Sequence, residues 1–317
     1  MSATAGVSGV DGILNIDKPY GITSMELVRT IKRASRLKRV GHGGTLDPIA
    51  TGVVAVCLGQ ATRFMEYIVD GTKEYEAVIE LGATTDTYDA MGEVTGRRDS
   101  ASVTLADVER ALESFRGVID QVPPMYSALK KQGKRLYELA RAGIEVEREP
   151  RRVEIHSVEL VEWTPPLVTA RVGCGRGFYM RSLAYDLGEL LGCGGHLKNL
   201  VRLRSGIFKL SDSIPLADAA RMFEEDTWQE ALHAPDAVLH EMGAAIVSKR
   251  LEEMMRHGQP LPADARLSGN ESQSRCRAYG VDGGFVGTLV FDASAAQWRP
   301  DKVFSLAYPE DEPQDSP

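Results

Sequence analysis

The sequence predicts an α+β protein that ends in a small, β-rich module. Residues 73–81 alternate, with apolar side chains on one face and three glutamates on the other, which is the pattern of a half-buried strand. Residues 27–31 instead place apolar side chains at helical spacing. Toward the C-terminus, short apolar runs are separated by glycine and aspartate, which predicts a compact β unit.

The first sixty residues predict two strands and a helix. Residues 12–17 form an apolar strand that enters a turn at residues 18–21. Thr23 and Ser24 are common N-cap residues, so we expect a helix to begin there. Residues 49–57 are almost wholly apolar and predict a buried strand.

Capping and breaking residues delimit the later elements. Thr104 and Asp107 resemble a capping box that opens a helix running to Phe115. Pro165 and Pro166 separate two strands, and a glycine at 192 ends an apolar-striped helix. The remaining expected elements are strands at 153–163 and 167–174, helices at 179–191 and 251–257, an acidic helical stretch at 215–236, and strands at 275–281, 285–291 and 302–307.

Length and composition indicate an ordinary globular protein. The chain has 317 residues, 43% hydrophobic and 26% charged, which is enough for one large domain and one small one. No apolar run approaches the roughly 18 residues of a membrane helix and the N-terminus lacks a signal-peptide pattern, so we expect a cytoplasmic protein without a membrane partner. Four scattered cysteines and six histidines lack metal-binding spacing, so we expect no metal and no disulfide framework.

Charge is distributed unevenly along the chain. The net charge is −8, but residues 1–210 hold 28 basic and 26 acidic residues (net +2), whereas residues 211–317 hold 9 and 19 (net −10). One stretch contains six basic residues and no acid, namely Arg29, Lys32, Arg33, Arg36, Lys38 and Arg39. Such a patch either attracts a polyanion or is the solvated face of a helix.

Asp47 lies in a loop rich in glycine and proline. The loop, Gly41-His-Gly-Gly-Thr-Leu-Asp-Pro48, has three glycines that permit a ligand to approach the backbone, and Pro48 restricts Asp47 to extended angles. Taken alone, such a segment is more often a surface turn. The apolar strand that follows anchors this loop on the core, which favours a functional carboxylate.

Six ordered blocks resemble the signatures of the TruB family of pseudouridine synthases. The Asp47 loop matches G-H-G-G-T-L-D-P-x-A-T-G-V. The other blocks are residues 12–24 (G-x-x-x-x-x-K-P-x-G-x-T-S), 73–89 (K-E-Y, then L-G-A-T-T-D-T-Y-D), 121–141 (Q-x-P-P-x-Y-S-A-L-K, then L-Y-E-L-A-R), 174–183 (C-G-x-G-x-Y-x-R-S-L) and 196–202 (H-L-x-x-L-x-R). Agreement across six ordered blocks is far more specific than any single one.

The resemblance implies a reaction and the residues that perform it. The family converts uridine in RNA to pseudouridine: the N1–C1′ bond breaks, the base rotates and C5 bonds to C1′, with no cofactor implied. Asp47 matches the family's nucleophile, which acts on either C6 of the base or C1′ of the ribose. Arg181 matches the arginine that pairs with this aspartate, and Tyr75 matches the tyrosine that stacks on the target base near the C5 proton.

Further residues carry weaker assignments from the same blocks. Tyr179 and Leu200 match residues that line the uracil pocket, and His42 matches a histidine that stacks where the flipped base was. Lys18 and Lys130 are interpreted either as RNA contacts or as packing residues. Without the resemblance, a strand tyrosine and a lone leucine would be assigned to the core.

Two positions depart from the family pattern. Val201 and Arg202 stand where two adjacent arginines often follow the pocket leucine, and Leu203 stands where threonine is common. These changes put one RNA-backbone contact in doubt, but not the chemistry.

The resemblance also implies an architecture. We expect a flexible N-terminus at 1–11, a catalytic domain built on a mostly antiparallel central sheet at 12–235, a PUA-like RNA-binding domain at 236–308 and a disordered acidic tail at 309–317.

The implied activity is isomerisation of the T-loop uridine, position 55, of tRNA by a monomer without an obligate protein partner. A tRNA-folding factor that remodels the T-arm is an alternative. A hydrolase of glycosidic bonds is another, although retaining glycosidases use two carboxylates and the matched blocks suggest no partner for Asp47. A guide-RNA-dependent relative would be expected to have basic tails.

Overall fold

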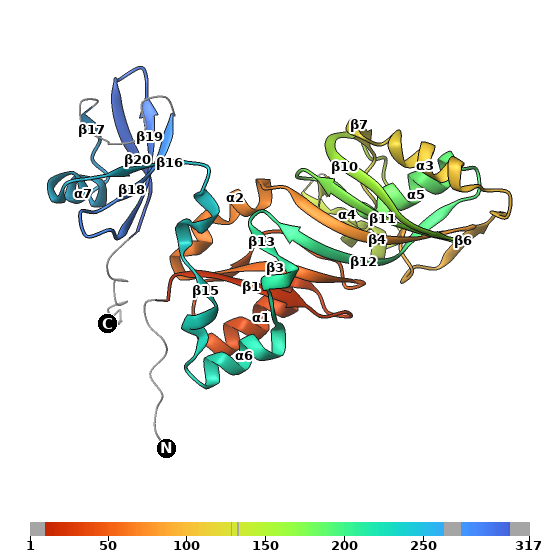
Figure 1. Ribbon diagram of the computed structural model, residues 1–317, viewed down its shortest axis with the longest axis horizontal. Coiled ribbons are helices and arrows are strands. Elements are labelled where there is room, and N and C mark those ends of the chain that lie inside the picture. The colour runs from red at the N-terminus through yellow and green to blue at the C-terminus, as the bar shows by residue number, and fades with distance from the viewer. Residues whose placement is uncertain (1–9, 128, 132, 263–273, 305–317) are drawn as a thin grey trace.

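The protein is built around one large sheet, which runs across the computed structural model in Figure 1. The structure describes residues 10–127, 129–131, 133–262 and 274–304. The strands of the large sheet are β1 (Gly12–Lys18), β2 (Val40–His42), β3 (Ala50–Leu58), β4 (Lys73–Leu81), β7 (Gly117–Gln121), β10 (Arg151–Thr164), β11 (Leu167–Cys174), β12 (Gly195–Ser205), β13 (Phe208–Lys209), β14 (Ile214–Pro215) and β15 (Leu232–His233).

The order of strands places the Asp47 loop, residues 41–48, beside the centre of the sheet. The order is β14-β1-β3-β12-β4-β11-β10-β7, and β2, β13 and β15 pair off this path with β3, β12 and β1. All neighbours run antiparallel except β12 with β3 and β1 with β14. The expected α+β fold with a mostly antiparallel central sheet is therefore confirmed.

Four helices pack on one face of this sheet. They are α1 (Ser24–Ser35), α3 (Leu105–Glu113), α5 (Met180–Leu190) and α6 (Leu216–Glu224), and their apolar side chains share one buried cluster with β1, β3, β4, β11 and β12. Thr23 and Thr104 form the capping boxes that open α1 and α3, as expected. The α3 helix ends at Glu113, two residues before the predicted end.

Smaller elements cover the rest of the sheet. The 3₁₀ helix η1 (Gly59–Phe64) and α2 (Met65–Asp70) pack on the opposite face from the four helices, against side chains of β1, β3 and β13. The others are the pair β5 (Ala83–Thr85) and β6 (Val94–Arg97), the pair β8 (Lys130–Lys131) and β9 (Lys134–Arg135), α4 (Leu136–Arg141), η2 (Leu210–Asp212), η3 (Trp228–Ala231) and η4 (Pro235–Leu239). No helix in the described ranges has the length and apolar character to cross a membrane.

A second, five-stranded sheet forms the C-terminal module. It contains β16 (Gly243–Ile246), β17 (Leu261–Pro262), β18 (Arg275–Tyr279), β19 (Phe285–Asp292) and β20 (Gln297–Val303), with α7 (Lys249–Arg256) packed on it. The last predicted strand, 302–307, overlaps β20 only at residues 302 and 303, because β20 begins at Gln297; residues 305–307 lie outside the described residues. Pro300 concealed the start of β20, since proline cannot donate to a strand ladder. It pairs with Leu289 of β19 next to a register shift and lies beyond the two residues of β20 that pair with β17.

The module is attached to η1 and α2. Phe64 stacks on Phe304 with ring centroids 5.5 Å apart and lies 5.8 Å from the ring of Phe285. Lys302 of β20 forms an ion pair with Glu66 of α2. In Figure 1 the blue module accordingly lies next to α2, away from α3 and α5.

Candidate active site

The loop that carries Asp47 is held by the start of α1. Ser24 Oγ donates to the carbonyl of Leu46 (2.9 Å) and accepts from the Leu46 amide (2.7 Å), both in buried positions. The Gly21 amide donates to the carbonyl of Pro48 (2.8 Å), and the Ala50 amide closes the turn on the carbonyl of Asp47 (3.0 Å). The loop is therefore fixed on both sides of the carboxylate.

Arg181 binds the Asp47 carboxylate through two hydrogen bonds. Its Nε donates to Oδ2 (2.8 Å) and its Nη2 to Oδ1 (3.3 Å), an arrangement that fixes the carboxylate plane. The carbonyls of Tyr126 (2.8 Å) and Thr87 (3.3 Å) accept the remaining guanidinium contacts. The Arg181 side chain is 6% exposed and that of Asp47 is 34% exposed, so one side of the carboxylate stays open to a substrate.

A second carboxylate, which the sequence analysis did not single out, faces the same arginine. Asp89 Oδ2 lies 3.8 Å from Arg181 Nε, while Asp89 Oδ1 accepts from the Met91 amide (3.0 Å) and from the Thr87 hydroxyl (2.7 Å). Only 9% of its side chain is exposed. Asp89 therefore helps to orient Arg181 and is poorly placed to activate a water, as a glycosidase partner would have to do.

Two tyrosines lie in the electrostatic field of Asp47. Tyr75 of β4 is half-buried on the helix-covered face of the sheet. Burial raises its pKa, the positive charge of Arg202 opposes this rise, and Asp47 adds to it. Tyr179 is the N-cap of α5, where Gln121 binds both its amide (2.9 Å) and its carbonyl (3.1 Å). Burial also raises the pKa of Tyr179, and Asp47 contributes to that rise.

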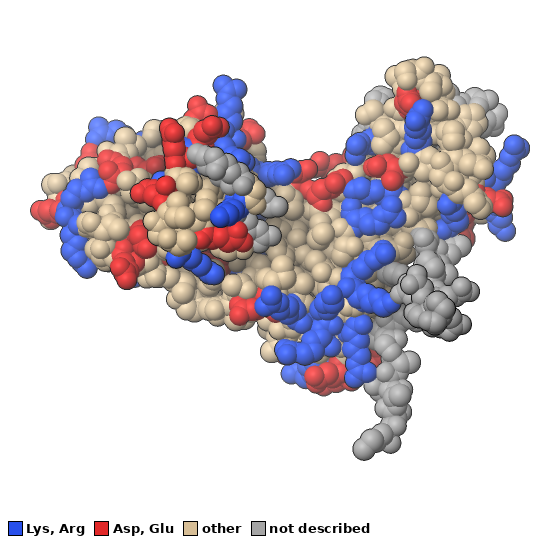
Figure 2. Space-filling model, turned by 180° about the vertical axis from the view of Figure 1, so that it is seen from behind, with Lys and Arg blue, Asp and Glu red and all other residues tan. Residues whose placement is uncertain are grey.

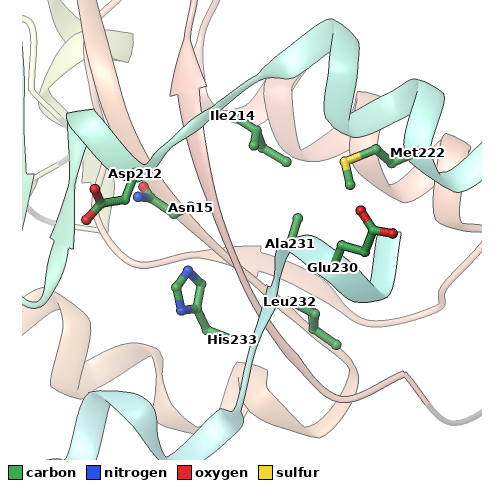
Figure 3. Close-up of a pocket in the computed structure, with 8 residues that line it drawn as sticks. All are labelled: Asn15, Asp212, Ile214, Met222, Glu230, Ala231, Leu232 and His233. Carbon is green, nitrogen blue, oxygen red and sulfur yellow. The ribbon is translucent and has the colours of Figure 1, made fainter. Parts of the chain in front are cut away.

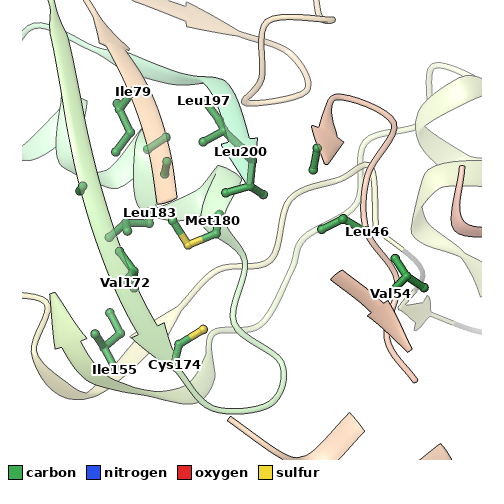
Figure 4. Close-up of a cluster of buried hydrophobic side chains, with 14 of the residues drawn as sticks. Leu46, Val54, Ile79, Ile155, Val172, Cys174, Met180, Leu183, Leu197 and Leu200 are labelled. Carbon is green, nitrogen blue, oxygen red and sulfur yellow. The ribbon is translucent and has the colours of Figure 1, made fainter. Parts of the chain in front are cut away.

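The apolar wall of the site belongs to the main core. Leu200 of β12 pairs with Ala50 on one side and Ala77 on the other. Figure 4 shows Leu200 and Met180 in one buried cluster with Leu46, the residue that precedes Asp47. The sheet, α5 and the Asp47 loop thus contribute side chains to the same core.

The surroundings of Lys18 favour a packing residue over an RNA contact, the two interpretations that the sequence allows. The residue has no exposed surface, and its Nζ donates to the carbonyls of Pro19 (2.9 Å) and Ile22 (2.8 Å). Burial lowers its pKa to about 8, with Asp47 opposing and Arg202 adding to the effect. Since a phosphate could not reach this ammonium without displacing the backbone around it, we assign Lys18 to the support of the loop.

The other two expected residues lie at the edge of the site or outside the description. His42 ends β2; burial lowers the pKa of its ring and Arg202 adds to this effect, so the neutral ring predominates near pH 7. Lys130 belongs to the backbone pair β8–β9, and its side chain lies outside the described residues.

A separate hollow of about 440 Å³ lies beside β1, lined by η3, β14, β15 and α6 (Figure 3). None of its lining residues belongs to the group around Asp47. Within the described ranges, no three His, Cys, Asp or Glu side chains are placed to hold a metal ion together.

The fold is shared with chains in solved complexes that contain Cbf5. A chain in the crystal structure of a Cbf5-Nop10-Gar1 complex superposes with a TM-score of 0.69 at 26% identity, covering 91% of this chain and 84% of that one. A chain in the archaeal box H/ACA sRNP Nop10-Cbf5 complex gives a TM-score of 0.70 at 24% identity, covering 93% and 86%.

Sequence comparison identifies the family of the chain. The model of the TruB family pseudouridylate synthase N-terminal domain matches residues 32–180, and that of the tRNA pseudouridylate synthase B C-terminal domain matches residues 181–247. Curated relatives named tRNA pseudouridine synthase B include one from Dehalococcoides mccartyi strain CBDB1, 44% identical over 93% of this chain and 97% of its own, and one from Symbiobacterium thermophilum, 48% identical over 79% and 83%. The chain belongs to the TruB family of pseudouridylate synthases, enzymes that isomerise uridine to pseudouridine.

Proposed function

We propose that this chain converts the T-loop uridine of tRNA, at position 55, to pseudouridine, with Asp47 as the nucleophile on a flipped-out base. The observation that carries the proposal is the two-point contact between Asp47 and the buried Arg181, which leaves one side of the carboxylate open. The proposal is supported by a relative that matches 93% of this chain and is named tRNA pseudouridine synthase B, a name that gives the substrate class but not the position. The chain acts as a monomer without a protein partner.

The site suits an isomerisation that needs no added group. Asp47 attacks either C6 of the uracil or C1′ of the ribose, and the N1–C1′ bond breaks. The base turns within the pocket walled by Leu200 and Tyr179 and C5 bonds to C1′. The bond to Asp47 breaks, which restores the free carboxylate, and the C5 proton is lost while N1 gains one. His42, whose uncharged ring can stack, fills the gap that the flipped base leaves in the RNA.

The test of this function uses the purified chain alone with a T-stem-loop minihelix. We expect one pseudouridine per molecule at position 55, and none when that uridine is replaced by cytidine. In cells that lack the protein, tRNA should have unmodified uridine at this position alone among its pseudouridine sites. A chain that binds the minihelix and alters its fold without forming pseudouridine would instead be a tRNA-folding factor.

Tyr75 is proposed to handle the proton at C5. Replacing Tyr75 by phenylalanine keeps an aromatic ring for stacking but removes the hydroxyl, whose pKa responds to the charges of Arg202 and Asp47. We expect the single-turnover rate to fall by about 10²–10⁴-fold, the range for loss of a proton-transfer group, with RNA binding within about threefold of wild type. An unchanged rate would remove Tyr75 from proton transfer and leave it a stacking role only.

Basic side chains on and after α1 form a surface for the RNA backbone. Arg29, Lys32, Arg33, Arg36, Lys38 and Arg39 are all exposed, and Figure 2 shows basic side chains gathered at the lower edge of the molecule, where α1 lies. The five-stranded C-terminal module, at 236–308 by the expected division, is proposed as a second RNA-binding unit of the PUA-like kind.

Charge reversal tests the α1 surface. Changing Arg33 and Arg36 to glutamate should weaken minihelix binding about tenfold and reduce the slope of log K against log salt by about 2, since each lost phosphate contact removes roughly one unit. The matched control reverses Arg110 and Arg116, exposed arginines that pair locally with Asp107 and Glu113. An equal change in salt slope for both pairs would make the α1 surface an ordinary solvated face.

A further inference from the structure

Arg202 is a fully buried arginine beneath the catalytic loop. It lies in the middle of β12, opposite Gly52 of β3 on one side and Tyr75 of β4 on the other. Its residue exposure is 1%. The strand that carries Arg202 therefore lies between the strand that follows the Asp47 loop and the strand that carries Tyr75.

The guanidinium binds the backbone of the loop. Nε donates to the carbonyl of Val53 (2.6 Å), Nη2 to that of Gly44 (3.2 Å) and Nη1 to that of Thr45 (3.4 Å). Gly44 and Thr45 come three and two residues before Asp47, and Gly44 has φ +128, a left-handed conformation that favours glycine. The three contacts join the loop to Val53, near the start of β3.

The same residue is the cross-strand partner of Tyr75, and its positive charge lowers the pKa of the Tyr75 hydroxyl against the effect of burial. Arginine has five N–H donors in a planar fork, so one residue can bind all three carbonyls while it lies beside the tyrosine. Lysine could not, because its ammonium is a single point on a flexible stem.

Burial of the Arg202 charge lowers the stability of the fold, which argues that the residue is there to serve the site. A buried charge is destabilising unless it is paired and hydrogen-bonded. In the described part of the chain, no carboxylate lies within ion-pair distance of Arg202, and the partners above are uncharged. Its field reaches the titratable groups nearby: it opposes the rise in the pKa of Tyr75 and lowers the pKa of Lys18 and His42.

We propose that Arg202 is a positioning residue of the site, which sets the Asp47 loop and the Tyr75 hydroxyl relative to each other. The inference rests on the proposed roles of Asp47 and Tyr75. Arg202 touches no reacting atom; it acts through the Gly44 and Thr45 carbonyls and through the tyrosine. A substitution that disturbs the hydrogen bonds of Arg202 therefore slows the chemical step but does not weaken RNA binding.

The experiment compares Arg202→Lys and Arg202→Gln with the control Arg204→Met in single-turnover assays at saturating minihelix. Arg202→Lys keeps the charge, and Arg202→Gln keeps two N–H donors without it. Arg204 lies two residues along β12, is 37% exposed and pairs with Glu74 (3.4 Å). We expect both Arg202 variants to lose about 100-fold in rate, as displacement of catalytic groups by about 1 Å commonly does, with Kd for RNA within about threefold and Arg204→Met at the wild-type rate.

A double-mutant cycle with Tyr75→Phe tests the link to the hydroxyl. If Arg202 acts partly through that hydroxyl, Arg202→Lys will lower the rate less in the Tyr75→Phe background than in wild type. Equal losses in both backgrounds would overturn this link. A wild-type rate for Arg202→Lys would overturn the positioning role. The same role would be overturned if the rate and RNA binding both fell in proportion to the fraction of the variant that fails to fold. Failure of the wild-type chain to form pseudouridine would instead reject the proposed function.

Discussion

Replacement of Asp47 by asparagine is expected to abolish pseudouridine formation while tRNA binding stays within a few-fold of wild type. Asparagine has nearly the same shape, and its amide oxygen can still accept from Arg181, so the loop should keep its place between Ser24 and Gly21. What is lost is the negative charge and the nucleophilic oxygen. Loss of a nucleophile in a covalent mechanism costs on the order of 10⁴–10⁶ in rate.

The measurement is single-turnover conversion on the T-stem-loop minihelix, with RNA binding followed separately. Asp99→Asn serves as the control, because that exposed carboxylate only accepts from the Ala101 amide in a local turn (2.9 Å). Retained turnover in Asp47→Asn, after a check by mass spectrometry that the asparagine has not deamidated, would rule out Asp47 as the nucleophile. A parallel loss of RNA binding would indicate that the charge is needed for the loop itself.

Local patterns predicted the loop better than they predicted its surroundings. Glycine and proline around Asp47 act on the backbone of their own neighbours, so the sequence shows a constrained carboxylate directly. Its partner Arg181 is 134 residues away, and only the family resemblance brought the two together. Asp89 and Arg202 were not recognised as parts of the site, because a charged residue in a sequence is normally expected on the surface.

The central strand β12 shows why a core element can escape prediction. Lys198, Arg202 and Arg204 interrupt its apolar character, and two register shifts against β4 break the alternation that marks a strand. Pairing with β3 and β4 on both sides makes it a strand regardless. Pro300 likewise concealed the start of β20, which its pairing with β19 and β17 makes a strand.

Because α5 packs closely on β12, we expect the substitution Gly188→Ala to have a large effect on stability. An added Cβ at Gly188 would overlap the amide nitrogen of Gly195 and the carbonyl carbon of Gly194, both backbone atoms that cannot rotate away. Alanine gains up to about 1 kcal/mol of helix propensity over glycine. Overpacking costs typically 1–3 kcal/mol and more where backbone must move, so we expect Gly188→Ala to lower the free energy of unfolding by about 2–4 kcal/mol.

The consequence should extend to the active site, because α5 carries Arg181 in its first turn and β12 carries Leu200. Thermal unfolding should show a Tm lower by about 5–15 °C, and the folded fraction should turn over more slowly than wild type. Gly192→Ala is the control: it has φ +75 but open space around its Cβ, so it measures backbone strain of about 1 kcal/mol without overlap. An unchanged Tm for Gly188→Ala would mean that α5 can move away from β12 freely, and that the separation of these two elements does not set the position of Arg181.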